Sequence, residues 1–317
     1  MGKRQAFRAG LFAVGAGQSA RFTPGLPPGA FSDDLVKTSM VEVVYVCSPD
    51  YWRQLFLSIR SLYASGSNFD SVRIFVTADE HPGWDFNRDE IKVSTVPDIG
   101  GGFWMLNKTH LCRSDCETVV FLDVDAIVIG KIDGIYDGVE SDIIARCAPR
   151  VEYGYHDKKE WKERISKYGC SNYPYLSSGF VIFKNRSQKD IKDRWIKVTK
   201  KILKGEEKED PDWHANQDAF SITCCVEGVE LSLMEEREHA YAMMGESPEG
   251  SIVYHLGMPN FYHYYFIAEE HIDTREKSMP VQKPDFLDIH RVKNRLVRKV
   301  KSKFGWEREA KPNWSKN

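Results

Sequence analysis

Short apolar runs alternate with amphipathic stretches along the first third of the chain. Residues 41–47, 72–77 and 91–96 are apolar and rich in β-branched side chains, which is typical of buried strands. Residues 51–63 and 103–112 instead carry apolar side chains at helical spacing. Strands and helices that alternate in this way predict a mostly parallel sheet covered by helices, with ligands bound outside the carboxyl ends of the strands.

The second half of the chain follows a looser pattern of the same kind. Its apolar or amphipathic stretches are residues 143–147, 179–183, 189–204, 216–223 and 251–254. We expect the third and fourth of these to be helices and the others to be strands. The last strand runs directly into His255, and the whole pattern predicts a single α/β domain over residues 40–284.

Two acidic residues interrupt the apolar run at residues 119–130. Asp123 and Asp125 are two positions apart, so along a strand both carboxylates point to the same side. Neighbouring anions in such a place are costly unless a cation or a shared proton compensates them, and a divalent metal that also binds phosphate can do so. We therefore interpret the pair as a candidate metal site for nucleotide or phosphate chemistry, against the alternative of a solvated turn.

The same spacing occurs again at Asp210 and Asp212, which provides a comparison within the chain. That pair follows a charged stretch, residues 204–209, and is separated by Pro211, which cannot lie in a central strand. We interpret it as a solvated loop, so only the pair inside the apolar run is a candidate site.

Composition narrows the class of protein. Of the 317 residues, 42% are hydrophobic and 28% are charged, and the net charge of −2 gives no reason to expect a nucleic-acid partner. No apolar stretch is long enough to span a bilayer. The seven cysteines are odd in number and lack C-x-x-C spacing, which argues against a disulfide framework or a zinc knuckle. Buried thiols in a reducing compartment are the simpler interpretation, so we expect a cytoplasmic protein.

Both ends of the chain differ from the domain between them. Residues 1–39 are basic and rich in glycine and proline, and we expect a mobile leader there, because the apolar core that a signal peptide needs is short and broken by glycines. Residues 285–317 begin with apolar side chains at helical spacing opposite a row of lysines and arginines. This basic amphipathic helix either docks on the domain or contacts a membrane peripherally.

Five segments resemble, in order, the motifs of the glycogenin-like retaining glycosyltransferases (family 8), which include the bacterial lipopolysaccharide galactosyltransferases. The segments are residues 43–62, 117–132, 175–183, 216–218 and 254–257. They look like the family's nucleoside-binding strand and helix, its metal-binding D-x-D segment, its acceptor-side segment, its D-Q-D segment and its terminal H-x-x-G motif. No single motif is decisive, and their order is the specific evidence.

The resemblance implies a GT-A fold and an enzyme that moves a sugar from a nucleotide-sugar donor, a UDP-sugar, to a hydroxyl group with retention of anomeric configuration. It implies Asp123, Asp125 and His255 as ligands of Mn²⁺ or Mg²⁺, and this mixed oxygen and nitrogen set suits manganese. The implied donor-binding residues are Cys47, Ser48, Tyr51, Lys108, Asp123, Val124, Asp125 and Gly257. The acceptor would be a saccharide, a glycolipid or a glycoprotein.

The same resemblance places Gln217 beside the reacting face of the sugar and lets Asp218 orient that sugar, whereas capping of a helix is the structural alternative for both. Because glutamine is a poor nucleophile, we expect front-face displacement through an oxocarbenium-like state rather than a covalent intermediate. The chain departs from the family pattern at Ser48, where the family has an acid near the uracil, at Ser177, where it has asparagine, and at Asn216, where it has aspartate.

Two other classes of function stay open at this point. A haloacid-dehalogenase-like phosphatase also has an apolar strand that ends in D-x-D, and it would use Asp123 as its nucleophile. Against it, several strands and helices precede the motif, and the chain contains no Gly-Asp dipeptide. The other class is a non-catalytic relative that only binds a nucleotide sugar or a glycan, and a complete set of metal ligands argues against that class.

Overall fold

The computed structural model describes residues 40–84, 86, 88–101, 103–148, 158–206 and 215–257. The leader predicted at residues 1–39 and the basic helix predicted within residues 285–317 lie outside these ranges, as do Asp210 and Asp212. The domain boundaries predicted from the sequence therefore stay predictions.

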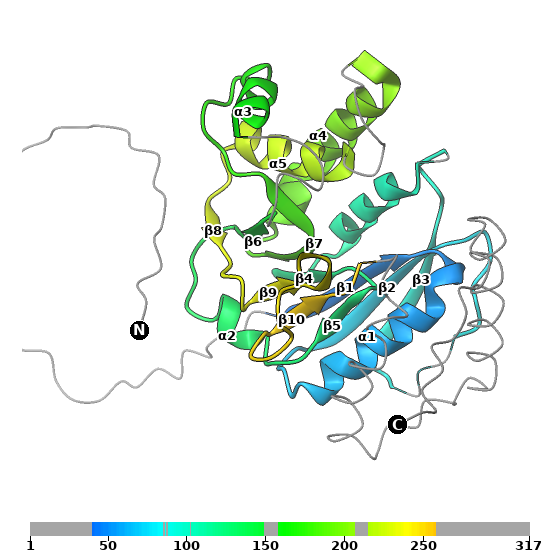
Figure 1. Cartoon of the computed structure of the whole chain (residues 1–317). Helices are drawn as coiled ribbons and strands as arrows, with labels where there is room; N and C mark the ends of the chain where they lie inside the picture. Colours follow the sequence, from blue (N-terminus) through cyan, green and yellow to red (C-terminus); the bar gives the residue numbers. More distant parts are fainter. Residues whose placement is uncertain are drawn as a thin grey trace, which may run out of the picture. The chain divides into compact units, whose positions relative to one another are not determined.

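A seven-stranded sheet forms the centre of the described structure (Figure 1). Its order is β3 (Ile91–Val96), β2 (Ser71–Thr77), β1 (Val41–Cys47), β4 (Thr118–Leu122), β7 (Leu176–Phe183), β6 (Ile143–Cys147) and β8 (Leu231–Leu233). Only β7 runs against the others, because it pairs antiparallel with both β4 and β6 while every other pair in this sheet is parallel. This confirms the predicted mostly parallel α/β sheet.

Helices and short helical turns cover both faces of the sheet. They are η1 (Pro49–Tyr51), α1 (Trp52–Ala64), η2 (Trp104–Arg113), α2 (Asp133–Tyr136), α3 (Lys158–Ser166), α4 (Ser187–Lys201), η4 (Ile202–Glu206), α5 (Ala215–Glu227) and η5 (Ala242–Met244). Because side chains alternate along β1, Val43 and Tyr45 pack with Leu55 of α1, whereas Val44 belongs to the cluster that contains Trp195 of α4. The layers are therefore helix, sheet and helix.

A second, three-stranded sheet contains the last strand of the described chain. Its order is β5 (Ala126–Val128), β10 (Val253–His255) and β9 (His239–Tyr241), with β10 antiparallel to β5 and parallel to β9. Only residues 123–125 separate β4 of the large sheet from β5 of the small one. The apolar run at residues 119–130 therefore passes from one sheet to the other, and its two acids lie at the crossing.

The segment expected to be an α-helix at residues 103–112 forms consecutive 3₁₀ turns, η2. All side chains from Leu106 to Cys112 are buried, so this part of the segment has no solvent face of the kind that an amphipathic helix presents. Side-chain contacts also hold its entry, since Asn107 accepts a 2.9 Å hydrogen bond from the backbone of Ile99 and donates one of 2.9 Å to Asp98. Apolar spacing alone does not distinguish these tighter turns from an α-helix.

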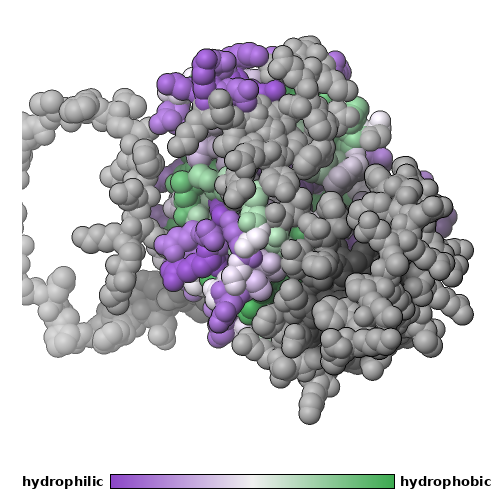
Figure 2. Space-filling model, in the orientation of Figure 1, coloured by the Kyte–Doolittle hydropathy of each residue, from purple (hydrophilic) through white to green (hydrophobic). Residues whose placement is uncertain are grey.

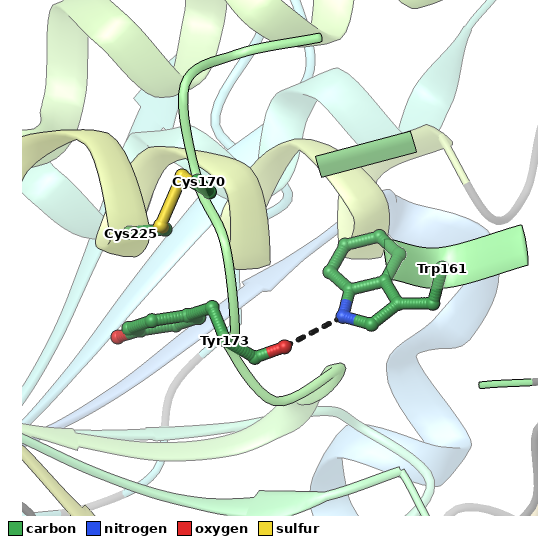
Figure 3. The surroundings of a disulfide bond; sticks show 4 residues. All are labelled: Trp161, Cys170, Tyr173 and Cys225. Atoms are coloured by element: carbon green, nitrogen blue, oxygen red, sulfur yellow. Dashed lines mark hydrogen bonds between the residues drawn. A yellow bond between two sulfur atoms is a disulfide. The ribbon is translucent and has the colours of Figure 1, made fainter. Parts of the chain in front are cut away.

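A disulfide joins Cys170 to Cys225, contrary to the expectation that the cysteines are unpaired (Figure 3). Cys170 follows α3 and Cys225 lies near the end of α5, with a sequence separation of 55 and a Cα–Cα distance of 6.3 Å. The pair forms because the segment after α3 packs against α5, a tertiary contact that cysteine spacing does not reveal. The other five cysteines are free thiols.

The described helices are amphipathic or short, and none of them has the length and apolar character that a bilayer crossing requires. Figure 2 shows a hydrophilic surface over α3, whose exposed side chains include Lys159, Glu160 and Lys162. Trp161 and Ile165 on the same helix are buried in the core.

Candidate metal centre and donor site

Asp123 and Asp125 occupy the turn between β4 and β5, at the carboxyl end of β4. The backbone N–H of Asp123 donates to Gly179 of β7 at 2.8 Å, and Ala126 N–H donates to the carbonyl of Asp123 at 3.0 Å, which closes the turn. Val124 between the two acids is buried. The pair thus lies where ligands bind in α/β sheets, although in a turn rather than on the strand itself.

His255 brings an imidazole to this turn from β10. Its Nε2 lies 3.3 Å from Oδ1 of Asp125, and the next residue, Leu256, donates a 2.9 Å backbone hydrogen bond to the carbonyl of Asp125. One ligand atom from each of Asp123, Asp125 and His255 can be chosen so that all lie within 4.8 Å of one another. The three residues that the sequence singled out as metal ligands are therefore brought together, and two carboxylates with one imidazole fit a divalent ion such as Mn²⁺.

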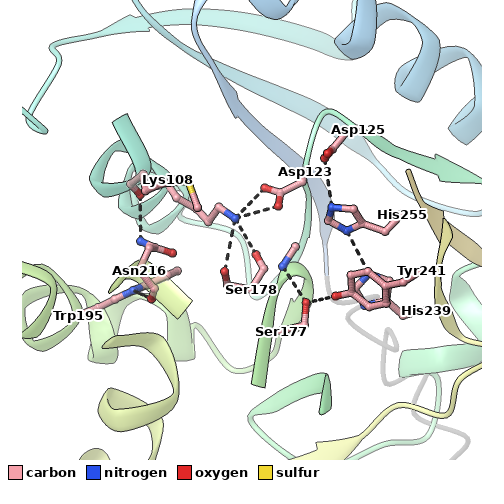
Figure 4. Close-up of polar contacts among 12 residues, drawn as sticks. Lys108, Asp123, Asp125, Ser177, Ser178, Trp195, Asn216, His239, Tyr241 and His255 are labelled. Carbon is pink, nitrogen blue, oxygen red and sulfur yellow. Dashed lines mark hydrogen bonds and ion pairs between the residues drawn. The ribbon is translucent and has the colours of Figure 1, made fainter. Parts of the chain in front are cut away.

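Lys108 of η2 supplies a positive charge next to these acids (Figure 4). Its Nζ lies 2.9 Å from each carboxylate oxygen of Asp123 and also donates to the carbonyl of Ser178 at 3.2 Å. The lysine side chain is only 8% exposed, whereas that of Asp123 is 23% exposed. The sequence predicted that Lys108 contacts the donor, and the structure places it against a candidate metal ligand.

Burial and charge move the pKa values of the three candidate ligands in different directions. Burial raises the pKa of Asp123, and the negative charge of Asp125 adds to that effect while Lys108 opposes it. Burial acts on Asp125 as well, but the charge and hydrogen bond of His255 outweigh it and hold the pKa of Asp125 below its ordinary value. Burial alone would lower the pKa of His255, yet the two carboxylates raise it. The centre attracts positive charge.

Gly179 of β7 is part of the centre although it has no side chain. A Cβ built on it would lie 2.3 Å from Cε1 of His255 and 3.0 Å from Oδ2 of Asp123. Such contacts are not possible for real atoms, so only glycine lets the imidazole and the carboxylate approach the strand this closely. The sequence analysis treated this glycine only as part of an apolar strand.

His239 and Tyr241 of β9 complete the surroundings of His255 and were not singled out from the sequence. Nε2 of His239 lies 3.4 Å from Nδ1 of His255, and the ring of Tyr241 stacks on that of His255 with a centroid distance of 5.0 Å. The hydroxyl of Tyr241 is hydrogen-bonded to Ser177 of β7. Burial, followed by the charges of His255 and Arg146, lowers the pKa of His239 well below its ordinary value. The sequence signal that could have identified them is the His-Ala-Tyr spacing, which places two polar aromatic rings on the same face of a strand.

The residues predicted to bind the nucleoside lie at the end of β1 and in η1. Cys47 is buried, which raises its pKa to about 12, and its carbonyl accepts a 3.2 Å hydrogen bond from Thr77. The backbone carbonyl of Ser48 accepts a 3.1 Å hydrogen bond from the N–H of Tyr51, and the ring of Tyr51 lies 6.5 Å from that of Trp104, which is 58% exposed. Gly257, with φ +73°, ends the described chain after His255. The predicted donor-binding role of these four residues stays a prediction.

The segment 216–218 begins α5, and polar contacts hold two of its three side chains. Asn216 donates to the carbonyl of Met105 in η2 at 2.9 Å, which joins α5 to the element that carries Lys108. Asp218 is fully buried and forms a 2.7 Å ion pair with Arg164 of α3. Gln217 is partly buried. The predicted roles of Gln217 and Asp218 towards the sugar stay predictions.

The sheet order, the two acids at the carboxyl end of β4 and the small sheet that returns to them agree with the GT-A fold of the solved glycosyltransferases that match this chain. The fold class predicted from the sequence is therefore confirmed. No family model and no curated protein matches the sequence.

Solved structures of glycosyltransferases share this fold. The galactosyltransferase LgtC, in complex with donor and acceptor sugar analogues, matches 75% of this chain and 97% of its own, with a TM-score of 0.54 and 14% identity. An active-site mutant of LgtC gives a TM-score of 0.53 at 14% identity. The bifunctional glycosyltransferase WbbM also gives 0.53 at 14% identity, and the match covers 77% of this chain and 53% of WbbM. At identities this low, the matches establish similarity of fold alone.

Proposed function

We propose that this protein is a metal-dependent glycosyltransferase that moves a sugar from a UDP-sugar to a hydroxyl group with retention of anomeric configuration. The observation that carries the proposal is the convergence of Asp123, Asp125 and His255 at the carboxyl end of β4 in a GT-A fold. The acids leave β4 of the large sheet, and the histidine comes from the small sheet. This arrangement supports a built metal centre better than a solvated turn.

Asp123, Asp125 and His255 would hold Mn²⁺ or Mg²⁺, which supplies a Lewis acid for the diphosphate leaving group. The chain's own contribution beside the ion is Lys108, whose buried ammonium group lies against Asp123. That ammonium can turn from the carboxylate to a phosphate oxygen and add a second positive charge to the leaving group. Cys47, Ser48, Tyr51, Val124 and Gly257 are the proposed further contacts of the donor.

Gln217 is the proposed residue beside the reacting face of the sugar, with Asp218 beside it in α5. The ion pair with Arg164 supports a fixed orientation for the start of α5. Because the amide of glutamine is a poor nucleophile, it does not form the covalent glycosyl intermediate that double displacement requires. Front-face displacement is therefore the mechanism that we favour for retention. The acceptor class, a saccharide, a glycolipid or a glycoprotein, belongs to the proposal as well.

The proposed location is the cytoplasm, with peripheral membrane contact through the basic helix predicted within residues 285–317. The argument from unpaired cysteines for this location is weaker than the sequence suggested, because Cys170 and Cys225 form a disulfide. The five remaining thiols still agree with a reducing compartment.

The test is UDP release from a panel of UDP-sugars with Mn²⁺, without an acceptor, by the parent protein and by Asp125→Asn. Asp137→Asn is the matched control, since Asp137 is exposed after α2 and outside the centre. We expect slow, Mn²⁺-dependent hydrolysis of one donor, lost in Asp125→Asn and kept in Asp137→Asn.

The alternatives predict other results in the same assay. A phosphatase that uses Asp123 as nucleophile would release phosphate from a phosphomonoester such as p-nitrophenyl phosphate and leave UDP-sugars intact. A binding protein would show a donor-dependent shift in melting temperature without turnover. Cleavage of a guanosine or thymidine donor alone would contradict the uridine assignment and retain the transferase.

A further inference from the structure

Three aromatic rings from two adjacent strands pack together beside the candidate metal centre. His239 and Tyr241 are two positions apart on β9, so they point to the same face, and in the parallel pairing His255 of β10 lies opposite Tyr241. The ring of His239 lies 5.6 Å from that of His255 and 4.5 Å from that of Tyr241. The orientation of His255 is therefore set by its neighbours on β9 rather than by solvent.

A largely buried polar network fixes β9 in turn. Glu246 accepts the backbone N–H of Tyr241 at 2.7 Å and forms two hydrogen bonds of 2.7 Å with Arg146 of β6. Arg146 also donates to the carbonyl of His239, and its guanidinium lies 5.4 Å from the centre of the Tyr241 ring. These contacts fix β9 relative to β6 of the large sheet, and β10 pairs with β9.

The two nitrogens of His255 face different groups. Nε2 faces Asp125 at 3.3 Å, and Nδ1 faces Nε2 of His239 at 3.4 Å. To bind a metal through Nε2, a neutral imidazole must carry its proton on Nδ1, and that proton then needs an acceptor. Among the residues that the structure describes, Nε2 of His239 is the acceptor that this nitrogen faces.

His239 has one unusual feature that suits this task. Its second nitrogen, Nδ1, is buried and has no hydrogen-bond partner within the described part of the chain. A purely structural side chain at this place would gain by being apolar, since the ring of Phe180 packs against it in a T-shaped arrangement with a centroid distance of 5.4 Å. Because Nδ1 is not committed to a partner, His239 can donate from Nε2 or accept there without losing a hydrogen bond elsewhere.

We infer that His239 is a positioning residue for the metal centre: by accepting a hydrogen bond from the Nδ1–H of His255, it keeps Nε2 of His255 available to the metal. When Nε2 of His255 instead donates to Asp125, His239 takes the other tautomer and donates to Nδ1. Each imidazole carries one proton in both arrangements, so the charge of the pair does not change. The inference rests on the proposed function, since it concerns the same metal centre.

The test compares the Mn²⁺ affinity of the parent with those of two variants, measured from the electron paramagnetic resonance signal of free Mn²⁺ with no nucleotide present. His239→Phe keeps an aromatic ring in the apolar surroundings but offers no acceptor, and we expect Mn²⁺ to bind roughly 10- to 100-fold more weakly. His239→Gln has both an acceptor and a donor, and we expect it to bind within about threefold of the parent.

A third variant separates failure of this inference from failure of the proposed function. If Asp125→Asn binds Mn²⁺ as tightly as the parent, the metal centre itself is wrong and the role of His239 with it. If Asp125→Asn is impaired while His239→Phe binds like the parent, only the role of His239 is overturned. Equal losses in His239→Phe and His239→Gln, with both variants folded by circular dichroism, would also overturn it, because packing rather than hydrogen bonding would then be responsible.

Discussion

Gly179 lies so close to His255 that a single added methyl group would overlap the imidazole, at 2.3 Å from its Cε1. The backbone of Gly179 also accepts the N–H of Asp123. One residue of β7 therefore sets the distance between a strand of the large sheet and the candidate ligands from both sheets.

Replacing Gly179 by alanine is the most local way to disturb the centre. The methyl group must displace His255 or Asp123, so we expect Gly179→Ala to weaken Mn²⁺ binding at least about 10-fold. Overpacking should also lower the free energy of unfolding by about 1–3 kcal/mol. Urea denaturation and Mn²⁺ titration measure the two effects. Gly134→Ala is the control, because a Cβ there meets no atom within 4 Å, and a similar loss of Mn²⁺ affinity in that variant would contradict the steric explanation.

The raised pKa of His255 predicts opposite pH dependences with and without metal. In the metal-free protein, the pair with Asp125 stabilises the fold fully below about pH 6.5, the ordinary value for histidine, and this contribution is lost as the pH rises through the raised pKa. Mn²⁺ binding needs the neutral imidazole, so its affinity should rise over that same range. Thermal melting across pH with and without Mn²⁺ tests this. His255→Gln should remove both dependences, and their survival in that variant would assign them to another group.

Lys108 should stabilise the metal-free protein as well as contribute to donor binding. Lys108→Met leaves the carboxylate of Asp123 without its cation, and breaking such a buried pair costs about 3–5 kcal/mol. Because Asp123 is 23% exposed, we expect the lower end of that range, and Mn²⁺ should restore part of the loss. Urea denaturation in EDTA and in Mn²⁺ measures both. Lys159→Met, from a pair that is 82% and 66% exposed, should change stability by less than about 0.5 kcal/mol.

The ion pair between Arg164 and Asp218 should link α3 to α5 strongly. Arg164→Met leaves a fully buried carboxylate without this partner, and we expect a loss of about 3–5 kcal/mol. The pair between Arg194 and Glu227 is far more exposed, so Arg194→Met should cost no more than about 1 kcal/mol. A double-mutant cycle with Asp218→Asn measures the coupling by chemical denaturation. Purely additive effects of Arg164→Met and Asp218→Asn would show that the pair contributes little.

The disulfide should contribute to stability through the loop that it closes. In the chain-entropy description, a loop of 55 positions is worth about 4 kcal/mol, so Cys225→Ser should lower the free energy of unfolding by up to that amount. Cys116→Ser, at a free and partly buried thiol, is the control. Reducing agent should destabilise the parent and leave Cys225→Ser unchanged. Six or more thiols titrated in the unfolded, unreduced protein would contradict the pairing.

The large sheet could be predicted from sequence because its strands are continuous apolar runs. Val41–Cys47 and Thr118–Leu122 are buried on both faces, so little except a central parallel strand fits them. The two acids after the second strand could also be identified from sequence, since nothing else in the apolar run at residues 119–130 is charged. His255 was found from its resemblance to a family motif, and its place at a strand end agrees with that motif.

The features that sequence analysis missed are tertiary contacts between distant segments. The disulfide depends on how the segment after α3 packs on α5, and Cys170 carries no local sign of its partner. The contact between His239 and His255 depends on the pairing of β9 with β10, two strands of three residues each that are too short for a clear pattern. Gly179 looks like an ordinary break in a strand until the imidazole beside it is seen.

The crossing between the two sheets also orders events during synthesis of the chain. Lys108, only 15 positions before Asp123, leaves the ribosome just ahead of the acids, whereas His255 follows in the last described strand. Asp125 and His255 are 130 positions apart, so at 5–20 residues per second the delay is about 7 to 26 seconds. During that interval the nascent chain contains Lys108 but not yet His255. Lys108 is therefore the first of the two positive partners that becomes available to the acids, and His255 is the second.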